Sequence, residues 1–226
     1  MQRSDRIPPV ASDRANRANG VDGVSFEFWG SVMIAFHLVI SAYGFWLPND
    51  PRGSWSDFVG SWELYKFGPA TKVNDARSYA KDSHDAGLRR AAKLALKYPP
   101  VRFNDAHREA IADGFTRACT EGQYICLACC IGHDHAHLII QRHDRDLETI
   151  AGHFKSHATR KLTSRGIHPL TGYVGKRGGL PTPWSEGCWK VFIIDATQLQ
   201  SAIGYVQRHP LKEVLPEQRW KFVTHV

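Results

Sequence analysis

Two histidines separated by a single residue are the part of this chain best suited to bind a metal ion. His135 and His137 flank Ala136 at the start of an apolar run that continues to Ile140. In a β-strand, residues i and i+2 point to the same face, so both imidazoles would project together. Two convergent imidazoles can hold one divalent ion when a third ligand comes from elsewhere. The spacing alone leaves open a polar strand edge, or histidines that act as general acid and base without a metal.

A tyrosine and a histidine one helical turn apart form the second chemical element. Tyr205 lies about 120° from the centre of an apolar helical stripe, so core packing does not account for it. His209 follows at i+4 and lies on the same side of the helix. Pro210 disfavours helical geometry in the residue before it, so we expect His209 in the last helical turn or at its exit. The stripe consists of Leu199, Ala202, Ile203 and Val206.

A tyrosine beside a metal ligand can act as a nucleophile. Its hydroxyl is weakly nucleophilic while protonated, and a metal-polarised electrophile makes the attack easier. The alternative at Tyr205 is an ordinary surface tyrosine, which its sequence neighbourhood alone does not exclude.

The elements that must position these residues alternate between strands and helices. Apolar, β-branched runs predict strands at residues 32–42, 124–131, 136–140 and 189–194, of which the second and third form a hairpin. Helical periodicity covers residues 106–118 behind the N-cap Asn104, residues 147–162, and a last helix capped by Asp195 with Gln198 three residues on. A short basic helix at 87–98 ends before Pro99. The fold class is therefore α+β.

Composition narrows the function classes. The 226 residues are 42% hydrophobic and 23% charged, which excludes a wholly disordered chain. No apolar run approaches the roughly 18 residues of a membrane span, and the start has no signal-peptide core, so we expect a cytoplasmic protein that binds no membrane. The net charge of +7 suits a polyanion such as DNA or RNA. Residues 1–25 read as a flexible basic tail before one domain at 26–226.

The five cysteines show no disulfide framework typical of secreted domains. Cys126, Cys129 and Cys130 lie in one apolar run and read as reduced, buried thiols. Cys126 and Cys129 could form half of a metal site, but no second pair completes four ligands.

Four stretches occur in a fixed order along the chain: FHLVISAYGFWLP, GHDHAHLII, ETIAGHFKSHATRKL and WKVFIIDATQLQSAIGYVQRHPLKEVL. In these stretches the chain resembles the single-tyrosine HUH transposases, which include small insertion-sequence transposases and REP-associated tyrosine transposases. The matching elements cover most of residues 32–215, and the segment 49–103 is an extended insert relative to the smallest members.

The resemblance implies a ferredoxin-like HUH endonuclease fold and an enzyme that cuts and rejoins single-stranded or hairpin DNA. His135 and His137 match the family's metal ligands, and Tyr205 matches the nucleophile that forms a 5′-phosphotyrosine. His209 stands where the family places a third ligand, usually an amide residue. The cofactor implied is Mg²⁺ or Mn²⁺, and a third imidazole would favour manganese. Members often act as dimers, and the sequence leaves monomer and homodimer open.

Cations and aromatic residues outside this centre are candidates for DNA contact. Tyr173 and Trp184 could stack on unpaired bases, or could pack within the fold. His153 and His157, also at i and i+4, flank a helical stripe; a second metal site is the alternative reading. The candidate phosphate contacts are Lys155, Arg160, Lys161, Arg165, Lys176 and Arg177.

Two other functions stay open. His133, His135 and His137 imitate the triple-histidine run of HIT-type nucleotide hydrolases, although Asp134 stands where that motif has an apolar residue. Alternatively, the chain is a domesticated protein that binds DNA hairpins and has lost catalysis.

Overall fold

The structure is a computed structural model that describes residues 33–47, 62–67 and 85–224. A four-stranded sheet forms its centre, in the order β2-β3-β1-β4. Every neighbouring pair of these strands is antiparallel. The expected tail at 1–25 and much of the insert at 49–103 lie outside the described residues. The strands are β1 (Ala35–Ser41), β2 (Cys126–Ile131), β3 (His135–Gln141) and β4 (Trp189–Ile193).

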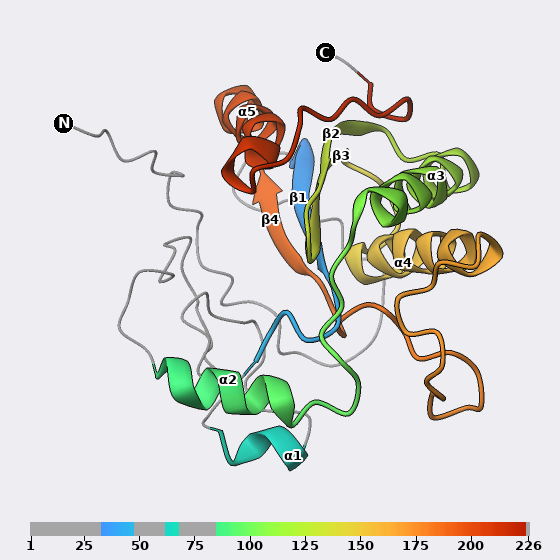
Figure 1. The fold of residues 1–226 in the computed structure, drawn as a ribbon. Helices are drawn as coiled ribbons and strands as arrows, with labels where there is room; N and C mark the ends of the chain where they lie inside the picture. The colour runs from blue at the N-terminus through green and yellow to red at the C-terminus, as the bar shows by residue number, and fades with distance from the viewer. Residues whose placement is uncertain (1–32, 48–61, 68–84, 225–226) are drawn as a thin grey trace, which may run out of the picture.

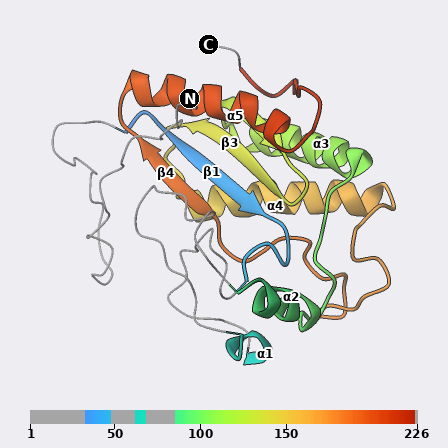
Figure 2. The same ribbon diagram turned by 60° about the vertical axis from the view of Figure 1, so that its left-hand side comes forward.

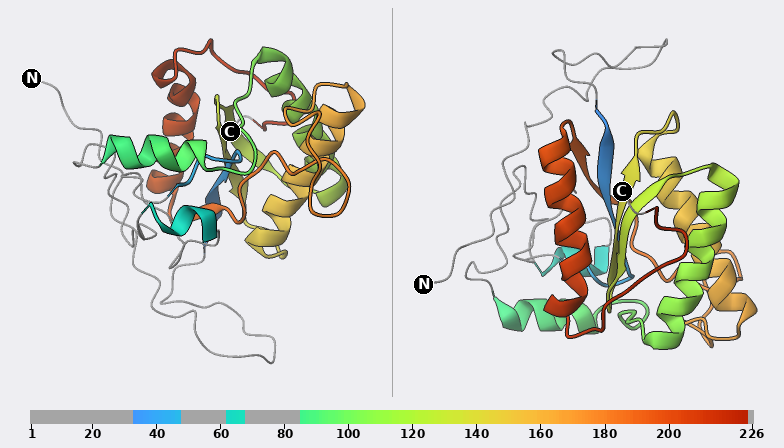
Figure 3. Two further views of the ribbon diagram at one scale, coloured as in Figure 1. Left: turned by 60° about the horizontal axis from the view of Figure 1, so that its bottom comes forward. Right: turned by 90° about the horizontal axis from the view of Figure 1, so that it is seen from above.

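The helices lie on both faces of this sheet (Figure 1, Figure 3). Helices α3 (Asp105–Gly122) and α4 (Leu147–Ser164) pack together on one face, and α5 (Ala196–Lys212) covers the other. The short helices α1 (Trp62–Tyr65) and α2 (Ala86–Leu94) lie beyond one end of the sheet (Figure 2). The chain order β1-α3-β2-β3-α4-β4 is the ferredoxin-like arrangement, so the expected α+β class is confirmed. Within the described ranges, no helix is long and apolar enough to cross a membrane.

The two faces of the sheet bury different residues, because side chains alternate along each strand. Phe36, Leu38 and Ile40 of β1 point toward α3 and α4 and join the larger core. Residues of the opposite parity point toward α5, where Ile139 and Ile193 of the sheet meet Ile203 and Val206 of the helix in a smaller core. His135 and His137 share the parity of Ile139, so β3 presents both imidazoles to the α5 face, as the spacing predicts.

Side-chain caps begin the long helices where the sequence predicts. Asn104 accepts a hydrogen bond from the His107 amide at 2.9 Å, and the His107 ring accepts from the Asn104 amide, which closes a capping box on α3. Asp195 accepts from the Gln198 amide at 2.8 Å and starts α5. At its C-terminal end α5 continues through Pro210 to Lys212, so the expectation that His209 lies in the last turn is confirmed. Helical residues therefore both precede and follow His209.

The C-terminal segment covers the free edge of β2. Val223 forms a parallel bridge to Cys126, and the Thr224 amide donates to the Cys126 carbonyl at 2.7 Å. The Gln218 side chain bonds both the amide and the carbonyl of Ile131, each at 2.8 Å. These bonds satisfy backbone groups that an edge strand otherwise leaves exposed.

Helices α3 and α4 approach most closely at Gly114. A methyl group added there would lie 2.5 Å from the backbone of Ala158, whereas one added at Gly152 of α4 would meet nothing within 4 Å. We therefore expect Gly114→Ala to destabilise the fold by about 1–3 kcal/mol, because the helices must separate. Gly152→Ala should instead stabilise it by about 0.5–1 kcal/mol through helix propensity. Urea unfolding of the two variants measures both; equal effects would show that the helices do not touch here.

Candidate active site

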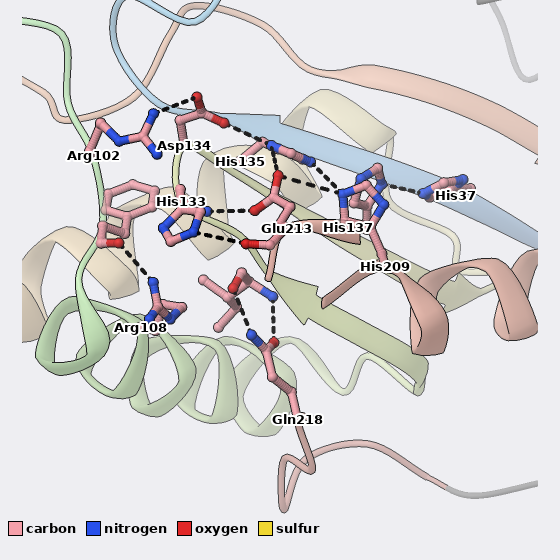
Figure 4. A network of polar contacts seen from close by, with 12 residues as sticks. His37, Arg102, Arg108, His133, Asp134, His135, His137, His209, Glu213 and Gln218 are labelled. Carbon is pink, nitrogen blue, oxygen red and sulfur yellow. Dashed lines mark hydrogen bonds and ion pairs between the residues drawn. The ribbon is translucent and has the colours of Figure 1, made fainter. Parts of the chain in front are cut away.

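Three imidazoles from two elements converge on the α5 face of the sheet (Figure 4). His135 and His137 come from β3, and His209 comes from the last turn of α5. One ring nitrogen from each lies within 4.8 Å of the other two. The Nε2 atoms of His135 and His209 are 3.0 Å apart, and the ring centroids of His137 and His209 are 4.3 Å apart. The structure thus brings together the three residues that the sequence proposed as ligands.

The remaining ring nitrogens of the β3 histidines are held by neighbours. The Nδ1 of His135 lies 3.0 Å from a carboxylate oxygen of Asp134. The Nδ1 of His137 lies 2.8 Å from the Nε2 of His37, on the adjacent strand β1. When Nδ1 carries the proton in such a contact, the Nε2 lone pair stays free for a metal ion.

Two buried nitrogens at this site have no hydrogen-bond partner among the residues that the structure describes: Nε2 of His137 and Nδ1 of His209. A buried polar atom without a partner is costly, so it indicates a missing ligand or ion. Burial, together with the neighbouring charges of His135 and His37, lowers the pKa of His137 well below its usual value. A neutral imidazole is the form that binds metal. The residues therefore fit a divalent cation, and an all-imidazole set suits a borderline ion better than magnesium.

Glu213 adds a carboxylate that the sequence reasoning missed. Its Oε1 lies 3.6 Å from the Nδ1 of His135 and 3.7 Å from the Nε2 of His209. Its Oε2 accepts a hydrogen bond from the His133 amide at 2.8 Å. Burial alone would raise the pKa of Glu213, but contacts with His209, His135 and His133 outweigh it and lower that pKa to about 2. The negative charge beside the imidazoles favours a cation there. The sequence signal that could have identified Glu213 is its position four residues after His209, one helical turn further on.

Tyr205 stands beside the three imidazoles. Its ring centroid lies 5.4 Å from that of His209 and 5.6 Å from that of His137. The side chain is half-buried, and its hydroxyl makes no hydrogen bond to any residue that the structure describes. Burial raises the pKa of Tyr205, with smaller contributions from Cys130 and Glu213. The Lys212 ammonium lies 4.7 Å from the centre of the tyrosine ring and supplies a positive charge at the site.

His37 is the second residue that sequence reasoning missed. It is 6% exposed, and burial, followed by the charges of His209 and His135, lowers its pKa to about 3. A neutral His37 can hold His137 in one tautomer and one orientation. We expect His37→Phe to weaken metal binding about 10–100-fold, the usual effect of losing a contact behind a ligand. Titration of the purified variant with manganese measures this. His37→Gln, which keeps a polar group, should lose less; equal loss in both variants would contradict the positioning role.

The cations proposed to contact DNA do not surround Tyr205. Lys155, Arg160 and Lys161 belong to α4, on the face of the sheet opposite α5. The Lys155 ammonium donates to the carbonyls of Ser185 at 2.8 Å and Gly187 at 2.5 Å, and burial lowers its pKa, so it fastens this loop to α4. Arg165, just past α4, pairs with Asp113 of α3.

The other two candidate cations, Lys176 and Arg177, are exposed on the loop between α4 and β4. The Tyr98 hydroxyl donates to the Val174 carbonyl in this loop at 3.0 Å, and the Tyr43 amide donates to the Pro183 carbonyl at 2.9 Å. These bonds join the loop to the residues that follow β1 and α2.

The aromatic candidates differ in their surroundings. Trp184 is 2% exposed, and its indole N–H donates to the Thr159 hydroxyl at 3.0 Å, so the packed alternative is confirmed for it. Tyr173 is 43% exposed and rests edge-on against Tyr98.

His133 precedes β3, and its ring contacts the Glu213 carbonyl at 3.2 Å. It is not part of the group formed by His135, His137 and His209.

The buried thiols are confirmed. Cys126, Cys129 and Cys130 are free and buried. Burial raises the pKa of each thiol, so these cysteines are poor nucleophiles at neutral pH.

No family model matches the chain, and no curated protein matches it. A search of solved structures finds similarity to a REP-associated tyrosine transposase bound to a REP hairpin, with 9% sequence identity and a TM-score of 0.41. The alignment covers 84% of this chain and 74% of the transposase.

Proposed function

We propose that this protein is a metal-dependent endonuclease and strand transferase that acts on single-stranded or hairpin DNA. Tyr205 is the nucleophile, and His135, His137 and His209 hold the divalent ion. The observation that supports the proposal most directly is the position of Tyr205, whose ring lies 5.4 to 5.6 Å from two of the three converging imidazoles. Its hydroxyl bonds none of the residues that the structure describes.

The substrate is inferred from the charge of the site. A bound divalent ion would draw charge from a non-bridging oxygen of a phosphodiester. Lys212 provides a cation beside the same tyrosine, and Lys176 and Arg177 are exposed on the loop between α4 and β4. The motif resemblance supplies the DNA class, and the exposed ring of Tyr173 on the same loop suits stacking on an unpaired base.

The bond changes balance without an added reactant. The Tyr205 oxygen attacks phosphorus and forms a new P–O bond, while its proton passes to solvent. The bond from phosphorus to the 3′ oxygen breaks, and that oxygen takes up a proton as a free 3′-OH. The 5′ end then stays attached to Tyr205 through a phosphotyrosine. A second 3′-OH can reverse these steps, because the covalent link retains the energy of the broken phosphodiester.

All groups of this centre come from one chain. Helix α5 follows β4 directly and lies across the same sheet that carries the histidines. A monomer can therefore bring Tyr205 to the metal ligands. A homodimer remains a proposal that this geometry does not require.

The test is a denaturing gel for a covalent protein–DNA adduct. The purified chain would be incubated with manganese and a pool of hairpin-bearing single-stranded DNA, and with the same pool annealed to its complement. We expect an adduct with the single strands that disappears in EDTA. Hairpin binding without any adduct would favour the non-catalytic DNA-binding function. If the chain neither binds the hairpin DNA nor forms an adduct with it, the proposal is overturned.

A further inference from the structure

A second group of convergent metal-ligating side chains lies between α3 and α4, on the other face of the sheet from Tyr205. Glu121 comes from the last turn of α3, and His153 and His157 come from successive turns of α4. One donor atom from each residue lies within 4.8 Å of the other two. We propose that these three residues form a zinc-type site that links the two helices.

The separations between donor atoms fit one small cation. The Nε2 atoms of His153 and His157 are 2.9 Å apart. The Oε2 of Glu121 lies 3.1 Å from the Nε2 of His157 and 3.9 Å from that of His153. Ligands about 2.0–2.1 Å from a tetrahedral zinc ion stand about 3.3–3.4 Å from one another. The observed distances bracket that value, so small side-chain movements suffice to bind the ion.

Contacts behind the donors orient them. The Nδ1 of His153 lies 3.1 Å from the Tyr124 hydroxyl, which also accepts a hydrogen bond from Arg145 at 3.1 Å. The tyrosine oxygen has a second lone pair for the His153 Nδ1–H, which leaves Nε2 free as a ligand. Arg117 binds the Oε1 of Glu121, so Oε2 is the oxygen left for the imidazoles.

The supporting structure is rigid. His153 and His157 share one helix, where residues at i and i+4 are neighbours. The edge-to-face contact of Phe115 with Phe154, 5.1 Å between ring centroids, packs the two helices together close to the site. A ligand set carried by packed helices is held better than one carried by loops.

The donor chemistry selects the class of ion. Two imidazoles and one carboxylate suit zinc, cobalt or nickel, whereas magnesium and calcium prefer oxygen ligands. His157 is buried, and Glu121 is exposed at the outer side of the group. The outer position leaves room for water as a fourth ligand. The Tyr124 hydroxyl beside this site is held by His153 and Arg145, so the effect we assign to the site is stabilisation of the α3–α4 pair.

The test counts zinc ions on the tag-free, chelator-treated chain. We expect two tight equivalents of zinc by calorimetry, one of which persists in His135→Gln/His137→Gln. In that double variant, free zinc at a hundredfold excess over its Kd should raise the Tm by roughly 5–10 °C. Adding His153→Gln should weaken the remaining site at least tenfold, and Glu121→Gln should do so as well. Glu109→Gln, another exposed acid of α3, is the matched control and should change nothing.

The outcomes separate this site from the proposed catalytic centre. Loss of all tight zinc binding in His135→Gln/His137→Gln would overturn the helix site and leave the endonuclease proposal intact. Unchanged zinc affinity after His153→Gln and Glu121→Gln would overturn it as well. Tight zinc binding that survives in the double variant and falls with His153→Gln supports it, whether or not the chain forms a DNA adduct.

Discussion

Replacing Tyr205 with phenylalanine should abolish the covalent DNA adduct while leaving the fold intact. In the proposed mechanism this hydroxyl attacks phosphorus, so its removal should reduce adduct formation at least about 10⁴-fold. The hydroxyl bonds no residue that the structure describes, so its loss should change the free energy of unfolding by no more than about 0.5 kcal/mol. Denaturing gels measure the first effect, and urea unfolding measures the second.

Tyr65→Phe is the matched control for this experiment. It also removes a tyrosine hydroxyl, but from a residue that is 63% exposed in α1, beyond one end of the sheet (Figure 2). It should keep full adduct formation. An adduct that survives in Tyr205→Phe would assign the nucleophile to another residue, and a variant that fails to fold would mean that the ring is chiefly a packing residue.

Substituting the β3 histidines should remove metal-dependent cleavage. His135→Gln or His137→Gln takes one imidazole from the set of three whose nitrogens lie within 4.8 Å. Charge stabilisation by a metal ion is worth several kcal/mol in the transition state, so we expect a loss of about 10³-fold or more. Initial rates of adduct formation over a manganese series measure it. Because glutamine keeps a polar group in a buried position, the fold should survive.

The control for this substitution is His143→Gln. His143 follows β3 and bonds the Gly122 carbonyl at 3.1 Å, at the opposite end of the strand from His135. Its replacement should leave the manganese dependence unchanged. Cleavage by His135→Gln or His137→Gln at the normal rate in EDTA would contradict the metal role of these residues.

The parts of the site that the sequence predicts are those governed by local periodicity. The two-residue spacing of His135 and His137 places both on one face of β3, and the four-residue spacing of Tyr205 and His209 places both on one side of α5. The N-caps at Asn104 and Asp195 are also local, since each side chain bonds an amide three residues ahead. Such features need no knowledge of the tertiary fold.

The parts that the sequence does not predict depend on long-range pairing. His37 reaches His137 across a gap of 100 residues, because β1 and β3 are neighbours in the sheet. Nothing near His37 in the chain indicates that register. The same limit applies to the cations of α4: periodicity shows that Lys155 and Arg160 leave the core stripe, but only the layer order shows that they lie on the face away from Tyr205.

The alternation along β3 makes the chemistry conditional on correct strand pairing. Ala136, Leu138 and Ile140 belong to the larger core, while the two histidines face α5. A slip by one residue would exchange the faces, bury the imidazoles beneath α3 and α4, and turn leucine toward the tyrosine. A chain in that state has no ligand set beside Tyr205. Under the proposed function, only copies with the native strand register could therefore form the DNA adduct, so the activity itself would report correct folding.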